Sequence, residues 1–174
     1  MIEELGIRES VQSDAALIEK LYPDAFPDED LLPLVRELLR DETETLSLVA
    51  IVDQALVGHV LFTACSIAGS PGKVSLLGPL AVASDWQRRG IGGALIRKGL
   101  QILKNAGAVQ VFVLGDPNYY KRAGFKPDAN VMPPYALPSE WAEAWQSVSL
   151  DEGQPPHGTL AVPQPWRQPA LWLP

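Results

Sequence analysis

A run of arginine and glycine residues between Gln87 and Gly93 has the residue types and spacing most suited to chemistry. It reads Gln-Arg-Arg-Gly-Ile-Gly-Gly and joins an apolar run typical of a strand to a periodic run typical of a helix. The first amides of a helix lack partners within it, the helix dipole adds partial positive charge there, and glycines let a ligand approach the backbone. Arg88 and Arg89 add full charges. The run predicts an anion-binding turn suited to phosphate, with a plain turn as the alternative.

Two common phosphate-binding motifs do not match this run. The Walker motif ends in Gly-Lys-Ser/Thr, and the sequence has no such ending. The dinucleotide motif needs a third glycine three residues after Gly92, where Leu95 stands instead. If the turn binds phosphate, it does so by another arrangement.

Charge is distributed unevenly around this turn. The whole chain carries a net charge of −7, but residues 88–126 contain eight basic residues and one acidic residue. Residues 1–53 contain four basic and fourteen acidic residues. This separation favours a local anion site in an acidic protein, with a solvated helix face as the alternative. RNA binding by the basic segment would need exposed aromatic platforms, for which Trp86 and Phe112 are poor candidates, so we expect no nucleic-acid partner.

Composition limits the class of protein. A chain of 174 residues with 47% apolar residues predicts one domain, spanning 1–174, with one buried core. A single cysteine, Cys65, excludes an internal disulfide and a cysteine-rich zinc site, and we interpret it as a core residue. Only two histidines are present, so we expect no metal. No apolar run reaches membrane-spanning length and the N-terminus resembles no signal peptide, so we expect a cytoplasmic protein without a membrane partner.

Hydrophobic periodicity predicts the elements that must position the turn. We expect a mixed α/β sheet in one domain, with a tight turn at 53–54, a second turn at 66–73 and a bulge or an opened edge at Gly78-Pro79. The predicted elements are a strand at 2–7, a helix at 14–21 capped by Ser13, a helix at 28–40 whose start is limited by Pro33, strands at 46–52, 55–67 and 74–83, a helix at 91–106 ended by Gly107, a buried strand at 109–114 and a short helix or turn at 117–123.

The last third of the chain is rich in proline and tryptophan. Eleven of the sixteen prolines and four of the five tryptophans lie between Pro117 and Pro174. Proline prevents long regular elements, whereas tryptophan is a large buried anchor. We therefore predict a core at about 1–127 and an irregular but ordered extension at about 128–174, with short strands at 148–150 and 159–162. Trp141 and Trp145 are expected to anchor this extension, or else to line a substrate pocket.

The stretch from Leu77 to Phe125 resembles the GNAT superfamily of acetyl-CoA-dependent N-acetyltransferases, and within it the bacterial YhbS-type branch. Gln87, Gly90 and Gly92 match the family motif Q/R-x-x-G-x-G/A. The segment 119–125, Tyr-Tyr-Lys-Arg-Ala-Gly-Phe, matches a second family element at the correct spacing. The resemblance implies the GNAT fold, a splayed central mixed β-sheet flanked by helices.

The resemblance also implies site residues and a reaction. The enzyme would move the acetyl group of acetyl-CoA, its co-substrate, to a primary amine by direct attack. Tyr120 would act as the general acid on the leaving thiolate, and Tyr119 would only pack. The residues implied in coenzyme A binding are Leu80, Ala81 and Val82 along the pantetheine arm and Gln87, Arg88, Arg89, Gly90, Ile91, Gly92 and Gly93 around the pyrophosphate.

The general base is where the sequence departs from some family members. These carry a glutamate on the third strand, but the corresponding stretch here, residues 74–77, is Val-Ser-Leu-Leu. His59 is a candidate base, with a structural role as the alternative. Asp85 is better interpreted as a surface or capping residue than as the base. Glu29 and Asp30 could attract a cationic substrate, or could simply complement a helix dipole.

Some questions of function stay open at this level. A non-catalytic module that binds or senses acyl-CoA would keep the glycine turn but would not need Tyr120. Substitution of Tyr120 by phenylalanine separates the two, because only an enzyme has turnover to lose. The acceptor could be a small amine, an amino acid, or an amine of a peptide or protein, and the apolar tail could meet a second subunit in a homodimer.

Overall fold

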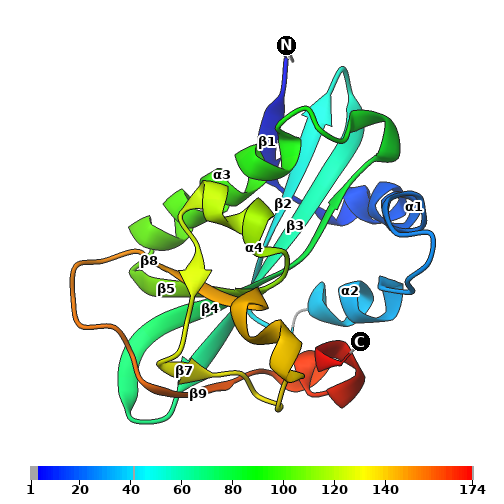
Figure 1. Cartoon of the computed structure of the whole chain (residues 1–174). Coiled ribbons are helices and arrows are strands. Elements are labelled where there is room, and N and C mark those ends of the chain that lie inside the picture. The colour runs from blue at the N-terminus through cyan, green and yellow to red at the C-terminus, as the bar shows by residue number, and fades with distance from the viewer. Residues whose placement is uncertain (1–3, 41, 174) are drawn as a thin grey trace. The chain divides into compact units, whose positions relative to one another are not determined.

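The computed structural model describes residues 4–40 and 42–173. The chain forms two compact units, the first from 1–62 and 78–99 and the second from 63–77 and 100–174. The strands are hydrogen-bonded in the order β1-β2-β3-β4-β5-β8-β6, with β9 paired to β3 and β7. The sheet contains both parallel and antiparallel strand pairs, and helices pack beside the strands (Figure 1). The predicted mixed α/β fold is therefore confirmed.

Three strands lie side by side in the first unit (Figure 1). They are β1 (Gly6–Glu9), β2 (Thr45–Val52) and the first part of β3 (Ala55–Ile67). β1 is antiparallel to β2, and Asp53 and Gln54 make the predicted tight turn with φ angles of 48° and 68°. The strand predicted at 2–7 starts at Gly6 among the described residues, because residues 1–3 lie outside them.

The helices that follow β1 differ from the prediction at their ends. A short 3-10 turn η1 (Gln12–Asp14) leads into α1 (Ala15–Ala25). The prediction that Ser13 caps this helix is wrong, because Ser13 lies inside η1. The Asp14 carboxylate instead accepts a hydrogen bond from the Val11 amide at 2.7 Å. α1 also runs four residues further than predicted.

α2 (Leu32–Leu38) is shorter than the helix predicted at 28–40. Pro33 stands in its first turn, the position where a missing amide hydrogen costs no helical bond. Leu34, Val35 and Leu38 are buried. The proline and the apolar spacing therefore fix α2, whereas the acidic residues 28–30 lie before it.

A long strand and a long helix flank the glycine turn. β4 (Ser70–Val82) precedes it and α3 (Ile91–Asn105) follows it. Gly58 of β3 lets α3 approach closely, because a Cβ there would lie 3.0 Å from Leu95 Cδ1 and 3.1 Å from Ile91 Cγ2. Gly107, with a φ of 95°, ends the helix as predicted.

The second unit is built on β5 (Ala108–Leu114), which pairs in parallel with the start of β4, as predicted. The turn predicted at 66–73 is shorter, because β4 begins at Ser70. The register shift in this pair lies between Lys73 and Val74. The other strands are β6 (Lys126–Pro127), β7 (Val131–Met132), β8 (Trp145–Ser149) and β9 (Gly158–Ala161). β8 lies antiparallel to β5 and to β6.

Short helical turns lie between and after the strands of both units, and two of them add Trp166 and Trp172 to the core of the second unit. They are η2 (Ser84–Trp86), which belongs to the first unit, α4 (Pro117–Tyr120), η3 (Lys121–Ala123), η4 (Ser139–Ala144), η5 (Gln164–Trp166) and η6 (Pro169–Trp172). Trp145 stacks on Phe112 of β5 at 5.5 Å, donates its indole hydrogen to the Val131 carbonyl at 2.7 Å and meets Trp172 edge-on. Trp145 is thus the predicted anchor, whereas Trp141 is only half-buried.

Candidate functional site

The turn between β4 and α3 has the backbone geometry of an anion-binding loop. Arg88 and Gly90 adopt left-handed conformations with φ angles of 63° and 84°. Left-handed residues of this kind turn successive amides toward a common concave side. The first hydrogen bond of α3 runs from the Ala94 amide to the Gly90 carbonyl at 3.0 Å, so the amides of residues 91–93 precede the helical ladder.

The space above this loop is open. Arg88, Arg89 and Gly90 are exposed, whereas Ile91 is buried and holds the start of α3. A Cβ atom placed on Gly90 would meet no other atom within 4 Å. The Arg89 guanidinium lies over the Trp86 ring at 5.0 Å, which restrains one of the two charges. The loop therefore offers amides and cations to a ligand in solvent.

Two side-chain contacts fix where the loop begins. The Gln87 side chain donates to the Val82 carbonyl at 3.1 Å. The Asp24 carboxylate, at the end of α1, accepts both the amide and the hydroxyl of Ser84 at 2.8 Å each. These bonds, the backbone bond first, hold the pKa of Asp24 below its ordinary value. Nothing in the sequence pattern indicated that Asp24 supports this loop.

Leu80, Ala81 and Val82 form the end of β4 in the first unit. Ala81 is buried, and Leu80 and Val82 are half-buried. The Ala83 amide binds the Val57 carbonyl of β3 at 2.8 Å, which attaches the strand end to its neighbour. The predicted splay between this segment and β5 stays a prediction.

Tyr120 ends α4 in the second unit, where aromatic rings surround it. Its ring meets Tyr119 edge-on at 5.0 Å and Phe125 at 5.7 Å between centroids. Its ring also lies over Gly115, where an added Cβ would come within 2.5 Å of Tyr120 Cε2. Burial, then the neighbouring Tyr119 and Asp116, raises the pKa of Tyr120 well above its ordinary value. The phenol is protonated at neutral pH and can donate.

The caps of the two short helices around Tyr120 fix its position. The Asp116 side chain accepts the Asn118 amide at 2.9 Å and starts α4. Gly124 ends the following turn with a φ of 94°, and the adjacent Phe125 is buried. Gly124 and Phe125 therefore shape and pack this segment.

His59 is fully buried on β3 and hydrogen-bonded at both ring nitrogens. Its Nδ1 lies 2.7 Å from the Tyr22 hydroxyl and its Nε2 lies 2.8 Å from the Ser47 hydroxyl. Burial lowers its pKa from 6.5 to about 4, although the nearby Asp14 acts in the opposite direction. The imidazole is therefore neutral at physiological pH.

Tyr22 also lines a cavity of about 290 Å³ in the first unit, called here the acidic cavity. Its lining includes Asp28, Glu29 and Asp30 together with apolar side chains, and contains no basic residue. Glu29 and Asp30 are therefore brought together with Tyr22, whereas Asp85 is an exposed residue of η2. Tyr22 was not a candidate from sequence, since only its spacing of four from Ile18 indicated burial.

Within the described residues, neither the cysteine nor a metal-binding group adds a candidate to those above. Burial raises the pKa of the Cys65 thiol to about 12, so the thiolate is scarce at neutral pH. Within residues 4–40 and 42–173, no three histidine, cysteine or acidic side chains are grouped to hold a metal ion. The helices of the same ranges are too short or too polar to cross a membrane.

Comparison with known proteins places this geometry in a family. The family model described as acetyltransferase (GNAT) family matches residues 15–125. YjhQ of Escherichia coli K12, named an uncharacterized N-acetyltransferase, is 39% identical over 146 residues, covering 80% of this chain and 81% of YjhQ.

Two solved structures also match closely. The structure of E. coli YhbS in complex with CoA matches with a TM-score of 0.84 and 27% identity, covering 94% of this chain and 92% of YhbS. A GNAT family acetyltransferase from Brucella melitensis in complex with acetyl-CoA matches with a TM-score of 0.76 and 32% identity, covering 94% of this chain and 98% of that protein. The chain described here belongs to the GNAT acetyltransferase family.

Proposed function

We propose that this protein transfers an acyl group, acetyl in the simplest case, from coenzyme A to a primary amine. The observation that carries the proposal is the loop at the start of α3, where left-handed Arg88 and Gly90 precede amides that the helix does not use. The bound CoA of YhbS and acetyl-CoA of the Brucella melitensis relative support the same ligand for this chain.

The loop fits a diphosphate in shape and charge. The open space at Gly90 and the exposed Arg88 and Arg89 suit an anion that arrives from solvent. In this proposal, residues 87–93 bind the pyrophosphate, and the backbone at Leu80, Ala81 and Val82 pairs with the pantetheine arm. Since the Gln87 side chain already occupies the Val82 carbonyl, the backbone groups of Leu80 and the Val82 amide are the natural partners.

Tyr120 supplies the proton that the reaction needs. When bound, acetyl-CoA provides the activated acyl group and a thiolate leaving group. Tyr120 is held protonated by its buried aromatic surroundings, so its hydroxyl can donate to the leaving sulfur. The closely packed Gly115, Tyr119 and Phe125 restrict the ring to one orientation.

The acidic cavity is the proposed acceptor side. Asp28, Glu29 and Asp30 give it negative charge, which attracts a cationic amine. Its volume of about 290 Å³ suits a small amine or the side chain of a lysine. The acceptor is therefore proposed to be a primary ammonium compound or a lysine-containing peptide.

Thermal unfolding with added ligands tests the binding half of the proposal. A ligand that binds only the folded state at a hundredfold excess over its Kd adds about 2.7 kcal/mol to the free energy of unfolding. Acetyl-CoA and coenzyme A should both raise the melting temperature, and ATP at the same concentration should not. If neither coenzyme A form raises it, the loop is only a turn and the proposal is wrong.

A further inference from the structure

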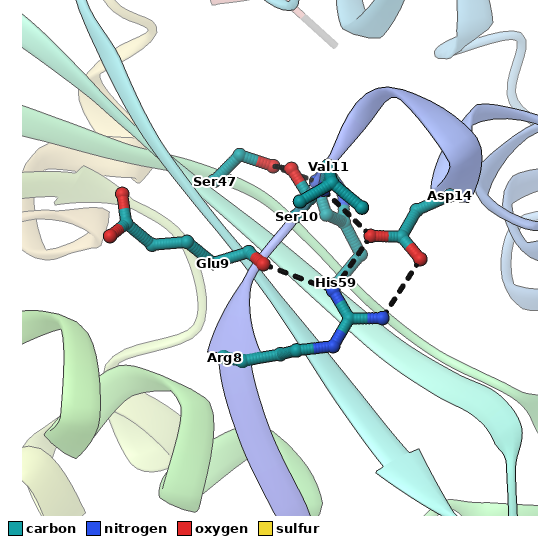
Figure 2. A network of polar contacts seen from close by, with 7 residues as sticks. All are labelled: Arg8, Glu9, Ser10, Val11, Asp14, Ser47 and His59. Carbon is teal, nitrogen blue, oxygen red and sulfur yellow. Dashed lines mark hydrogen bonds and ion pairs between the residues drawn. The ribbon is translucent and has the colours of Figure 1, made fainter.

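A chain of four hydrogen-bonded side chains crosses the first unit. Tyr22 Oη lies 2.7 Å from His59 Nδ1, His59 Nε2 lies 2.8 Å from Ser47 Oγ, and Ser47 Oγ lies 2.7 Å from Ser10 Oγ. Figure 2 shows the part that joins His59, Ser47 and Ser10. Tyr22 and His59 are fully buried, whereas Ser47 and Ser10 are half-buried, so the contact between Tyr22 and His59 is shielded from solvent.

Every member of the chain can both donate and accept a proton. A hydroxyl has one hydrogen and two lone pairs, and a neutral imidazole has one donor and one acceptor nitrogen. The chain can therefore be polarised in either direction without breaking a contact. All three distances lie within the ordinary hydrogen-bond range, which is the reach that proton transfer requires.

The two ends of the chain lie at different cavities of the first unit. Tyr22 lines the acidic cavity with Asp28, Glu29 and Asp30. Ser10 lines a cavity of about 720 Å³, called here the outer cavity. The lining of the outer cavity is Ser10, Val11, Gln12, Ala15, Ile18, Leu39, Arg40 and Glu42. A polar chain, buried at Tyr22 and His59, thus links the linings of the acidic cavity and the outer cavity.

We propose that Tyr22, His59, Ser47 and Ser10 form a proton relay that removes the proton of the acceptor ammonium. The ammonium gives a proton to Tyr22 Oη as the Tyr22 hydrogen moves to His59 Nδ1. The hydrogen on Nε2 moves to Ser47, that of Ser47 to Ser10, and that of Ser10 to water in the outer cavity. One proton enters and one leaves. After product release, Ser10 takes a proton from water in the outer cavity, Ser47 returns a hydrogen to His59 Nε2, and the hydrogen on Nδ1 passes to Tyr22 as Tyr22 releases one to water in the acidic cavity, which restores the starting tautomer.

Burial explains why His59 passes a proton on and does not store it. The neutral imidazole is favoured because desolvation penalises the imidazolium and lowers its pKa to about 4. Concerted transfer along the chain avoids a charged ring. The relay also replaces the glutamate that some family members carry and that residues 74–77 lack.

A separate ion pair holds the surroundings of the relay in place. Arg8 and Asp14 form two hydrogen bonds at 2.8 and 3.0 Å, and Asp14 also accepts the Val11 amide (Figure 2). The bond to Arg8 is the main reason that the pKa of Asp14 lies below its ordinary value. Asp14 is thus an ionised carboxylate that is held by Arg8 and the Val11 amide and takes no part in the hydrogen-bonded chain.

This proposal rests on the proposed transfer to an amine, and kinetics of the full-length protein test both. Thiol release is measured with saturating acetyl-CoA and the best acceptor from a panel of diamines, polyamines and lysine peptides. We expect Tyr22→Phe to lower kcat about 100-fold, at the lower end of the range of acid–base catalysis, and Ser47→Ala about tenfold, below that range, because water can take its place. Ser13→Ala, an exposed serine of the adjacent turn, is the matched control and should keep wild-type kcat.

A solvent isotope measurement separates relay from packing. In mixtures of H2O and D2O, wild-type kcat should depend on deuterium content along a curve, because several protons move together. In Ser47→Ala the plot should become straight. His59→Gln is a further variant, since glutamine can keep both hydrogen bonds but does not shuttle protons at neutral pH. Its kcat should fall while its acetyl-CoA affinity and melting temperature stay near those of the wild type.

The outcomes distinguish the two claims. Wild-type kcat in Tyr22→Phe would overturn the relay alone, and so would slow variants that keep the curved isotope plot. Transfer by the wild-type protein to none of the amines would overturn the proposed function and the relay with it.

Discussion

The loop at the start of α3 and the surroundings of Tyr120 are built in opposite ways. The loop is exposed and presents backbone amides and two arginines, with left-handed geometry at Arg88 and Gly90. Tyr120 is held by ring contacts with Tyr119 and Phe125, and its pKa is raised by burial. In the proposed function, the first region binds an anion and the second keeps a proton on a phenol.

This difference predicts which property each region controls. Changes in the loop alter contacts that exist before and during the reaction, so they should change affinity. Changes at Tyr120 alter the proposed general acid, which would act as the bond to sulfur breaks, so they should change kcat. A substitution that changes only the affinity or only kcat would support this division, and one that changes both would contradict it.

The largest effect is expected from Tyr120→Phe. Removal of the hydroxyl takes away the proposed general acid, and kcat should fall about 1,000-fold, in the middle of the range for this kind of catalysis. The Kd for acetyl-CoA should stay unchanged. Steady-state kinetics and a binding titration measure the two quantities.

The matched control for this variant is Tyr119→Phe. It removes a hydroxyl from the adjacent tyrosine, which we interpret as a packing residue, so kcat should stay within about threefold of wild type by the same rule. Equal losses of kcat in the two variants would show that the Tyr120 hydroxyl has no catalytic role that the Tyr119 hydroxyl lacks.

The next effect concerns stability and comes from His59. Its pKa is about 4 in the folded protein against an ordinary value of 6.5, so the unfolded chain binds a proton first. The stabilisation from the neutral buried ring is complete above pH 6.5 and is lost as the pH falls toward 4, up to about 3 kcal/mol. Chemical denaturation at several pH values should show this slope, and His59→Gln should reduce it.

The range from pH 4 to 6.5 is chosen so that the neighbouring carboxylate of Asp14 contributes little to the slope. Asp14 faces His59, and its pKa is lowered by Arg8, so its own contribution is lost only at more acidic pH. An equal slope between pH 4 and 6.5 in wild type and His59→Gln would contradict the burial of a neutral imidazole.

A smaller effect on rate is expected from Gly115→Ala. The new Cβ would stand 2.5 Å from Tyr120 Cε2, so the ring must move. A displaced catalytic group typically costs a factor of about ten to 100, and we expect about tenfold in kcat with little change in acetyl-CoA affinity. A tenfold loss of affinity instead would mean that the two regions are not separable.

An effect of similar size, on affinity and not on kcat, is expected from Gly90→Ala, which should weaken acetyl-CoA binding about tenfold. A left-handed conformation costs a residue with a Cβ about 1–2 kcal/mol, which the loop can relieve by moving its amides. Gly69 supplies a matched control, because it has a φ of 82° and equally open space in the turn before β4. Gly69→Ala should lose similar stability but keep its affinity, as a titration of both variants will test.

Local patterns predicted the fold well from sequence. The β3 bounds, the start of α3 and the parallel strand β5 follow from apolar periodicity and from glycines at the breaks. The ends of α1 and α2 were harder, because a carboxylate at Asp14 replaced Ser13 in the turn before α1. The short strands β6 and β7 have only two residues each and carry no periodicity.

The same difference between local and long-range patterns applies to the candidate site. The loop residues and Tyr120 stand in contiguous motifs, so the sequence indicates them directly. The polar chain collects Ser47 and His59 from two strands, Tyr22 from a helix and Ser10 from the segment after β1, and its contacts span up to 37 positions. Such pairs are made only when the strands assemble, and no spacing within one segment predicts them. The same holds for the Asp24 contact to Ser84.

Transfer of a labelled acetyl group tests the central claim most directly. The wild-type protein is incubated with acetyl-CoA labelled in the acetyl group and a panel of primary amines, and the products are separated by mass. We predict labelled amide with at least one amine, and its loss in Tyr120→Phe. A protein that binds acetyl-CoA but labels no amine in the panel would contradict the assignment of catalysis and would instead be a sensor of acyl-CoA.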